Sequence, residues 1–316
     1  MGTASARTVV AAALETLRLE VPFRISGYTF SEGTVALVTL SGPDGIEGRG
    51  EGNGVYYLDD DAAGICRTIE THRDTIERGL TRTELQSLLP AGGARNALDC
   101  AFWELESKRA NVPVWQLAGL ASARTLLTTI TLSADDPARV EAGARARAHA
   151  LALKLKLDGD LDVDVERVRA VRRARPDVWF GVDANQGYTV DRLERLMPTL
   201  VEAGVQLLEQ PIARGREADL DGFSSPIDLA ADESVQDSAD IERMVGRFDV
   251  INIKLDKCGG LTEGLRMVEI ARRLGLRTMV GSMFGTSLAA APGFVLGQLC
   301  EVVDLDGPLI HAEDRS

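Results

Sequence analysis

Three acidic residues in the middle of the chain could together bind a metal ion. Asp183, Glu209 and Asp232 each end a short apolar run, and the three runs follow one another along the chain. If these runs are adjacent strands, which lie about 4.8 Å apart, the three carboxylates converge on one point. Like charges held so close repel one another unless a cation lies between them, and an all-oxygen ligand set suits Mg²⁺. The triad therefore predicts a magnesium site; the alternative is a structural network in which the carboxylates only pair with lysines.

Lysines flank this predicted site on two sides. Lys154 and Lys156 lie two residues apart in the run LALKLK, so they face the same side of one strand. Lys254 ends the run VINIK four strands later, which is the opposite side of an eight-stranded barrel. A free lysine has a pKa of about 10.4. We expect crowding by a second lysine and by Mg²⁺ to lower that pKa towards about 7 to 8, where an amine can act as a base.

This arrangement suits the removal of a proton from the carbon beside a substrate carboxylate. One lysine would take the α-proton, the metal would stabilise the resulting enediolate, and the opposite lysine would return a proton and invert the carbon. Schiff-base chemistry at Lys156 or Lys254 is the main chemical rival, because class I aldolases also place a lysine in a barrel. The carboxylate triad favours proton transfer, since such an aldolase needs no metal.

The segments that carry these residues form a repeat along the chain. Eight apolar runs, each with a polar last residue, end at Thr131, Lys156, Asp183, Glu209, Asp232, Lys254, Ser282 and Asp304. From the second run onward they recur about every 25 residues, the length of one strand, one helix and two loops. This alternation predicts an α/β fold with a parallel (β/α)7β TIM-like barrel, and a doubly wound open sheet is the runner-up. Barrel active sites lie at the C-terminal ends of the strands, so the polar ends predict a catalytic rim.

The first third of the chain has a different pattern. Residues 34–40 (TVALVTL) are β-branched and apolar, and residues 41–45 are turn-like, which predicts strand, turn and strand. Residues 95–110 carry apolar side chains at helical spacing. We therefore predict two domains: an α+β capping domain over residues 1–121 and the barrel over residues 122–316.

Composition excludes several classes of protein. Asp and Glu number 48 against 35 Lys and Arg, giving a formal charge of −13, whereas a nucleic-acid binder normally shows a basic surface. No apolar run approaches the roughly 18 to 20 residues of a membrane span. The four cysteines are far apart, which argues against a zinc finger and for a reducing compartment. We expect a cytoplasmic protein that binds neither nucleic acid nor membranes.

Taken together, these motifs carry a family resemblance. The order KLK, VDAN, LEQP, ADES and NIK resembles the muconate-lactonizing subgroup of the enolase superfamily. The segments INIKLDKCGGLTE, MVGSM and DLDGP, with LPAGGARNALDCAFWELE in the first third, resemble more closely its dipeptide epimerases of the L-Ala-D/L-Glu type. The resemblance covers nearly the whole chain and implies a capping domain over a (β/α)7β barrel, with two cap loops that contact the substrate side chains.

The resemblance also implies roles for individual residues. The acid/base lysines match Lys156 and Lys254, and the magnesium ligands match Asp183, Glu209 and Asp232. The substrate-binding positions match Lys154, Asp304, Asp306, Ser282 and Thr131. Among these, Lys154 would bind the substrate carboxylate, and the acidic pair Asp304 and Asp306 suits the α-ammonium group of a dipeptide. The implied protein is a magnesium-dependent isomerase, a dipeptide epimerase that forms a homo-oligomer.

The chain departs from the family pattern in three places. Members that bind an acidic side chain carry an arginine in the first cap loop, and residues 25–32 (ISGYTFSE) have none, so we expect poorer use of acidic dipeptides. The second cap loop ends in the acidic run 59–61, which we expect to be solvated; it would favour a cationic substrate if it reached the pocket. The chain stops twelve residues after Asp304, which predicts a short or missing C-terminal return to the cap.

Other functions remain open at this point. An N-acylamino acid racemase, an o-succinylbenzoate synthase or a cycloisomerase of the same subgroup would use the same lysines and metal. The pair Asp304 and Asp306 favours a substrate with a free amino group, because it would repel an N-succinyl carboxylate. A non-catalytic barrel that binds a sugar or phosphate through the Gly- and Ser-rich segment after the seventh run is a less favoured alternative.

Overall fold

A computed structural model describes the chain from residue 7 to residue 315, apart from residues 26–27 and the side chains of residues 21–30. The chain begins with an antiparallel sheet of three strands in the order β1 (Val9–Ile25), β2 (Tyr28–Ser41) and β3 (Glu47–Gly52). A turn over residues 42–45 joins β2 to β3 and closes with a hydrogen bond from the N–H of Gly42 to the carbonyl of Ile46. The predicted strand, turn and strand are confirmed here.

Helices cover one face of this sheet. They are α1 (Ala62–Thr71), α2 (Arg73–Glu77), α3 (Arg82–Leu88), α4 (Gly93–Ala110) and α5 (Val114–Leu117), preceded by the 3-10 turn η1 (Tyr56–Leu58). Helix α4 lies directly on β3, where a Cβ atom at Gly48 or Gly50 would collide with the carbonyl oxygen of Ala101 or Ala97. Glycine at these two positions therefore allows the close approach of helix and strand. A continuous apolar core fills the space between the sheet and the helices.

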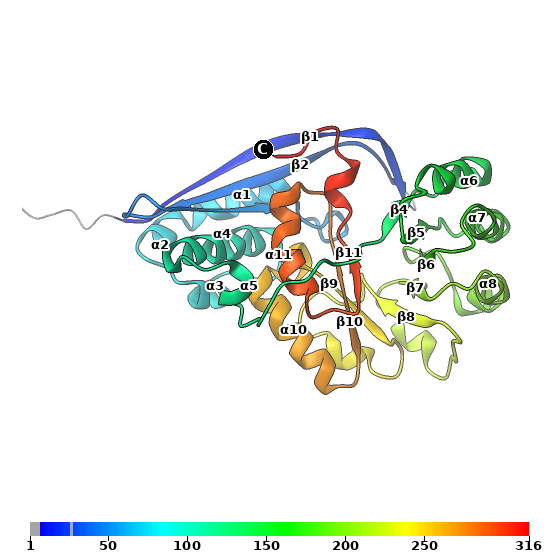
Figure 1. Ribbon diagram of the computed structural model, residues 1–316. Helices are drawn as coiled ribbons and strands as arrows, with labels where there is room; N and C mark the ends of the chain where they lie inside the picture. Colours follow the sequence, from blue (N-terminus) through cyan, green and yellow to red (C-terminus); the bar gives the residue numbers. More distant parts are fainter. Residues whose placement is uncertain (1–6, 26–27, 316) are drawn as a thin grey trace, which may run out of the picture.

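The second part of the chain is a parallel eight-stranded sheet rolled into a barrel (Figure 1). Its strands lie side by side in chain order: β4 (Ile130–Leu132), β5 (Ala152–Lys156), β6 (Trp179–Asp183), β7 (Leu207–Glu209), β8 (Asp228–Ala231), β9 (Val250–Lys254), β10 (Arg277–Gly281) and β11 (Val302–Asp304). The N–H of Thr129 donates to the carbonyl of Val303 over 3.0 Å and brings the first and last strands together. The predicted (β/α)7β architecture is confirmed, and the open doubly wound sheet is wrong.

The connections contain α6 (Pro137–Ala146), α7 (Leu161–Ala174), α8 (Val190–Glu202), α9 (Leu255–Cys258), α10 (Leu261–Arg273) and α11 (Ser287–Gly297). After β7 and β8 the described residues form only the 3-10 turns η2 (Glu217–Leu220) and η3 (Ile241–Met244). The prediction of a helix after each strand is therefore wrong at these two connections. The segment after β7 holds Gly215, Gly222 and Pro226, residue types that favour turns over helix. No helix in the described part of the chain is long and apolar enough to cross a membrane.

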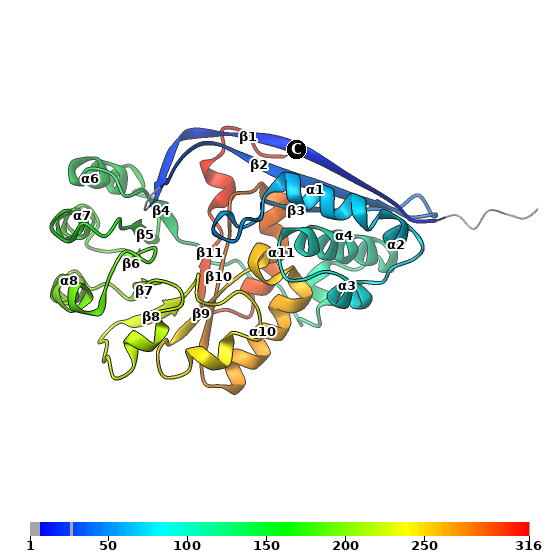
Figure 2. The same cartoon turned by 180° about the vertical axis from the view of Figure 1, so that it is seen from behind.

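The segment after Asp304 returns to the N-terminal sheet, so the prediction of a short or missing return was wrong. The 3-10 turn η4 (Gly307–Ile310) follows β11, and His311 then pairs antiparallel with Leu19 of β1. The N–H of Ala312 donates to the carbonyl of Arg18 over 2.9 Å. Few residues suffice because the hairpin of β1 and β2 extends across the barrel and passes close to the C-terminal end (Figure 2).

Candidate active site

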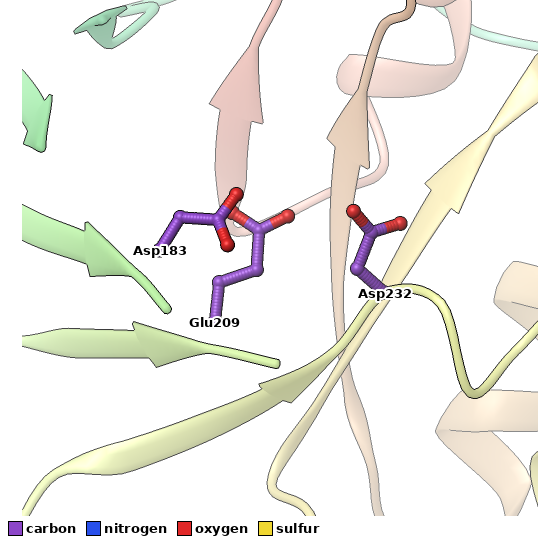
Figure 3. A group of neighbouring side chains, drawn as sticks. All are labelled: Asp183, Glu209 and Asp232. Atoms are coloured by element: carbon purple, nitrogen blue, oxygen red, sulfur yellow. The ribbon is translucent and has the colours of Figure 1, made fainter. Parts of the chain in front are cut away.

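The predicted carboxylate triad comes together at one end of the barrel. Asp183 and Glu209 are the last residues of β6 and β7 and lie opposite each other in the parallel ladder, and Asp232 directly follows β8. Each offers a carboxylate oxygen, and these oxygens all lie within 4.8 Å of one another (Figure 3). The three side chains are almost completely buried. Buried carboxylates that converge in this way can hold a divalent cation between them.

The three predicted lysines surround the triad. The Nζ atom of Lys156 lies 2.5 Å from an oxygen of Asp183, and the Nζ atom of Lys254 lies 2.6 Å from an oxygen of Asp232. Lys154 contacts Glu209 over 3.1 Å. Lys154 and Lys156 share β5, whereas Lys254 ends β9, with the three strands of the triad between them. The two predicted bases therefore approach the pocket from opposite sides of the triad.

The carboxylates pair with lysines, as the structural alternative would have it, but the charges do not balance. Asp183, Glu209, Asp232, Glu233, Asp304 and Asp306 bring six acidic groups to the site or its lining. The basic groups beside them are Lys154, Lys156, Lys254 and Lys257, the last of which lies 2.6 Å from Asp232. With all ten groups ionised, the site would carry an excess of two negative charges. Burial and the charge of Asp232 raise the pKa of Glu233 to about 8, and a divalent cation at the triad would favour the ionised carboxylates. The donor set and its charge therefore fit such an ion.

Burial and charge act in opposite directions on the pKa values of these groups. Burial lowers the pKa of Lys254, but the carboxylates of Asp232 and Glu209 outweigh it and hold that pKa well above its ordinary value. The pKa of Lys154 is raised in the same way by the acidic groups around it. Burial and the nearby charge of Asp183 raise the pKa of Glu209 to about 7. Here the carboxylates pair directly with the ammonium groups of Lys154 and Lys254. The expected lowering of a lysine pKa depends on Mg²⁺ binding to the same carboxylates, and it stays a prediction.

The remaining predicted residues lie along one wall of the same pocket. The N–H of Thr131 in β4 donates to Asp306 over 2.6 Å, and Asp304 accepts hydrogen bonds from Lys154 and from the Thr129 hydroxyl. Ser282 follows β10 and also lines the pocket. Burial and the neighbouring carboxylate of Asp304 raise the pKa of Asp306 to about 6. All ten predicted residues thus meet at one site.

Several residues at the site were not predicted from the sequence. Tyr56 and Tyr57 reach the pocket from the N-terminal domain, and Glu233 follows the last triad member. The Asn252 side chain donates to Glu209 over 2.6 Å. Asn252 could have been found, because it lies two residues before Lys254 on the same strand and therefore on the same face. The tyrosines had no comparable signal, since their place depends on how the N-terminal domain covers the barrel.

The predictions for the two cap loops differ in whether the structure can test them. The side chains of residues 21–30 lie outside the described part of the structure, so the prediction from the missing arginine stays a prediction. The acidic run is not part of the described pocket lining: Asp59 is exposed, Asp60 accepts from the N–H of Gly93 over 2.7 Å, and Asp61 caps α1. The carboxylates of Asp60 and Asp61 therefore stabilise the N-terminal domain, and the run does not support a cationic substrate.

A barrel whose strand ends carry two opposed lysines around a carboxylate triad, covered by an α+β domain, defines an enolase-superfamily enzyme. Comparison with known families agrees. Residues 6–119 match the mandelate racemase/muconate lactonizing enzyme N-terminal domain, and residues 138–302 match the enolase C-terminal domain-like family. The chain therefore belongs to the mandelate racemase/muconate lactonizing enzyme family of the enolase superfamily.

Similar proteins within this family are racemases and epimerases. The chain is 37% identical to L-Ala-D/L-Glu epimerase of Escherichia coli over 94% of this chain and 92% of that protein. It is 40% identical to N-acetyl-D-glutamate racemase of Pseudoalteromonas over 76% of each chain. Among solved structures, an enolase family member from Agrobacterium tumefaciens with homology to dipeptide epimerases, bound to sodium and L-Ala-L-Glu, has a TM-score of 0.92 and 38% identity over 98% of this chain and 94% of that one. A dipeptide epimerase from Enterococcus faecalis complexed with Mg and L-Leu-L-Tyr has a TM-score of 0.91 and 28% identity over 98% of this chain and 92% of that one.

Proposed function

We propose that this protein is a magnesium-dependent dipeptide epimerase that inverts the α-carbon of the C-terminal residue. The observation that carries the proposal is the placement of two lysines on opposite sides of a buried carboxylate triad, in a chain similar to such epimerases. Inversion at carbon by the two-base route uses a base on one face and an acid on the other. The strands that carry Lys156 and Lys254 supply these two faces.

In the proposed mechanism the two lysines exchange roles between the two epimers. The amine of one lysine removes the α-proton, and the ammonium group of the other delivers a proton to the opposite face. When held by Asp183, Glu209 and Asp232, Mg²⁺ would balance the negative charge that grows on the substrate carboxylate and would weaken the pairing of these ligands with the lysines. Lys154, buried between Glu209 and Asp304, would add a fixed positive charge at the same carboxylate.

The acidic pair at the end of β11 supports a substrate with a free amino group. Asp304 and Asp306 are both buried and line the pocket, so their carboxyl groups face any bound ligand in a dry environment. An ammonium group between them would form charge-assisted hydrogen bonds, which are stronger than those of a neutral amide. This feature favours a dipeptide over the N-acylated amino acid that the Pseudoalteromonas relative is named for.

The wall of the pocket favours an apolar side chain on the inverted residue. Tyr56, Tyr57, Met283, Phe284 and Ile310 contribute aromatic and aliphatic surface to the lining. Among the described lining residues, the only cationic side chains are the three lysines already engaged at the triad. A carboxylate placed against an apolar wall without a partner costs several kcal/mol, whereas burying a large apolar side chain gains about 1.5 to 3 kcal/mol.

A dipeptide screen in D₂O tests both parts of the proposal. The protein with added Mg²⁺ is incubated with L-Ala-L-Xaa dipeptides, and solvent deuterium at the C-terminal α-carbon is followed by NMR. We expect exchange and inversion that excess EDTA abolishes, with a higher kcat/KM for Ala-Phe than for Ala-Glu. Exchange with N-acetylglutamate and with none of the dipeptides would instead identify an N-acylamino acid racemase. A higher kcat/KM for Ala-Glu would contradict the side-chain preference alone.

A further inference from the structure

A buried carboxylate outside the catalytic rim links the N-terminal domain to the barrel. Glu51 lies in β3, and its side chain is 0% exposed. One of its oxygens accepts a hydrogen bond from the N–H of Thr286 over 2.7 Å, and the other accepts from the Thr286 hydroxyl, also over 2.7 Å. Thr286 is the residue that caps α11 at its N-terminus. The carboxylate therefore fixes the start of this barrel helix against the N-terminal sheet.

The cation that compensates this buried charge comes from the C-terminal segment. The guanidinium group of Arg315 donates to Glu51 over 2.9 Å from Nε and over 2.8 Å from Nη2. The same group lies 2.5 Å from Glu15 of β1 and donates to the Thr286 hydroxyl over 3.0 Å. The Arg315 side chain is 20% exposed. One residue thus joins β1, β3 and the start of α11.

Two walls of the pocket are attached to this cluster. The segment that ends at Thr286 carries Met283 and Phe284, and the segment that ends at Arg315 carries Ile310; all three side chains line the pocket. A second contact joins the two segments, because the N–H of Ser287 donates to the Asp314 carboxylate over 2.8 Å. A displacement of Arg315 would therefore loosen both walls, while Lys156, Lys254 and the triad are held by other strands.

We propose that Arg315 is a positioning residue for substrate binding: by pairing with buried Glu51 it holds Thr286, and with it the pocket wall formed by Met283, Phe284 and Ile310. The assignment rests on the proposed function, because it concerns the site where the dipeptide would bind. Removing Arg315 would leave the buried charge of Glu51 uncompensated. We therefore expect Glu51 and the Thr286 that it holds to move, in addition to the loss of one ion pair. The catalytic groups stay in place, which separates substrate binding from the chemical step.

The experiment compares Arg315→Ala and Arg315→Lys with Arg18→Ala, which removes an exposed arginine from β1 beside the same segment. We expect Arg315→Ala to raise the KM for a dipeptide about tenfold, equivalent to about 1.4 kcal/mol of binding, with kcat nearly unchanged. Arg315→Lys should restore part of the affinity, and Arg18→Ala should resemble the wild-type protein. In a Glu51→Gln background, where no buried charge needs a partner, Arg315→Ala should have a much smaller effect.

Hydrogen exchange of the backbone amides supplies a measurement that does not depend on turnover. We expect Arg315→Ala to speed exchange in residues 283–288 and 310–315 and to leave that of β5 and β9 unchanged. If the wild-type protein acts on no dipeptide, the proposed function fails while this exchange pattern still tests the role of Arg315. Unchanged exchange in both segments, an equal loss of kcat and kcat/KM, or the same effect in both Glu51 backgrounds would overturn the assignment.

Discussion

At the residue scale, Glu209 is the member of the site whose ionised form depends most on nearby positive charge. It is buried between Asp183, Lys154 and Asn252, and burial together with the charge of Asp183 raises the pKa of its carboxyl group. A group in this position is stable as a carboxylate only when enough positive charge surrounds it. This explains why a cation and Lys154 are both expected to act on the same side chain.

The first prediction concerns the metal. Glu209→Gln keeps the shape of the side chain and removes its charge, so we expect Mg²⁺ affinity to fall at least about 100-fold, since even residues behind metal ligands typically contribute 10- to 100-fold. Isothermal titration with Mg²⁺ measures this, and thermal unfolding checks that the variant folds. Glu202→Gln, an exposed change on α8, is the control. Epimerisation at the wild-type rate in the Glu209 variant or in excess EDTA would refute the metal site.

The second prediction concerns the two lysines. Lys156 and Lys254 end strands separated by the three strands of the triad, so each should serve one epimer. Removing either amine should lower epimerisation by at least about 10² to 10⁴, the range of one general base. In D₂O, Lys156→Ala should exchange the α-proton of one epimer only, and Lys254→Ala that of the other. Loss of exchange on the same epimer in both variants would show that the lysines do not act from opposite faces.

At the scale of elements, the short helix α9 joins the barrel to the loop that carries the two tyrosines. Asp256 in α9 is buried, and it accepts hydrogen bonds from the N–H of Asn53 over 3.1 Å and from the side chain of Asn96 over 3.0 Å. Asn53 lies three residues before Tyr56. This carboxyl group therefore positions the tyrosine wall of the pocket, two residues after Lys254.

The third prediction follows from the burial of Asp256. Burial raises the pKa of this carboxyl group to about 7 from its ordinary value of 3.8. Between these values the folded protein binds a proton that the unfolded chain does not, so the contribution of Asp256 to stability is present at low pH and is lost as the pH rises to about 7. The Asp256→Asn variant has no carboxyl group to titrate at this position, so its free energy of unfolding does not fall in this way as the pH rises. Relative to the wild-type protein, the variant should gain up to about 1.4 kcal/mol of unfolding free energy per pH unit across this window.

Urea unfolding at several pH values between 4 and 8 measures this gain. Asp74→Asn, at an exposed position on α2, is the control and should show no such trend. A stability difference between Asp256→Asn and the wild-type protein that stays constant with pH would contradict the prediction.

At the scale of the whole molecule, both parts of the chain contribute residues to the candidate active site. The two tyrosines come from the N-terminal part, and the lysines and the carboxylates of the triad come from the barrel. We propose the division at residues 121 and 122 as the domain boundary, because residues 122–129 form neither helix nor strand between α5 and β4. The homo-oligomer and the cytoplasmic location stay predictions from the sequence.

The fourth prediction concerns the contact between the two domains. Arg95 of α4 is buried and donates to the carbonyl oxygens of Leu89 in its own domain and of Cys258 in the barrel. In Arg95→Ala these buried carbonyl oxygens lose the guanidinium group as their hydrogen-bond donor. Each unsatisfied carbonyl lowers the free energy of unfolding by about 1 to 3 kcal/mol. We expect urea unfolding to show a loss of unfolding free energy of that order in one transition that both domains share. Arg78→Ala, at an exposed position, should change little, and a loss confined to one of two separate transitions would contradict the coupling.

The barrel and the polar rim at its strand ends could both be predicted from the amino-acid sequence, because both follow from local periodicity. Alternation along a strand places Lys154 and Lys156 on one face, and the regular spacing of apolar runs makes Asp183, Glu209 and Asp232 the ends of neighbouring strands. Parallel strands that are neighbours in the chain are neighbours in the sheet here, so the order of motifs became the order of side chains around the rim.

The way in which the N-terminal domain covers that rim could not be predicted from the sequence and became visible in the folded molecule. The contacts of Tyr57 with the pocket, of Asp256 with Asn53 and of Glu51 with Arg315 join residues that are far apart in the chain. No periodicity encodes such pairs, because their distance depends on how two separately formed cores pack against each other. The same cause explains why the acidic run 59–61 is not part of the pocket lining and why the segment after Asp304 reaches β1.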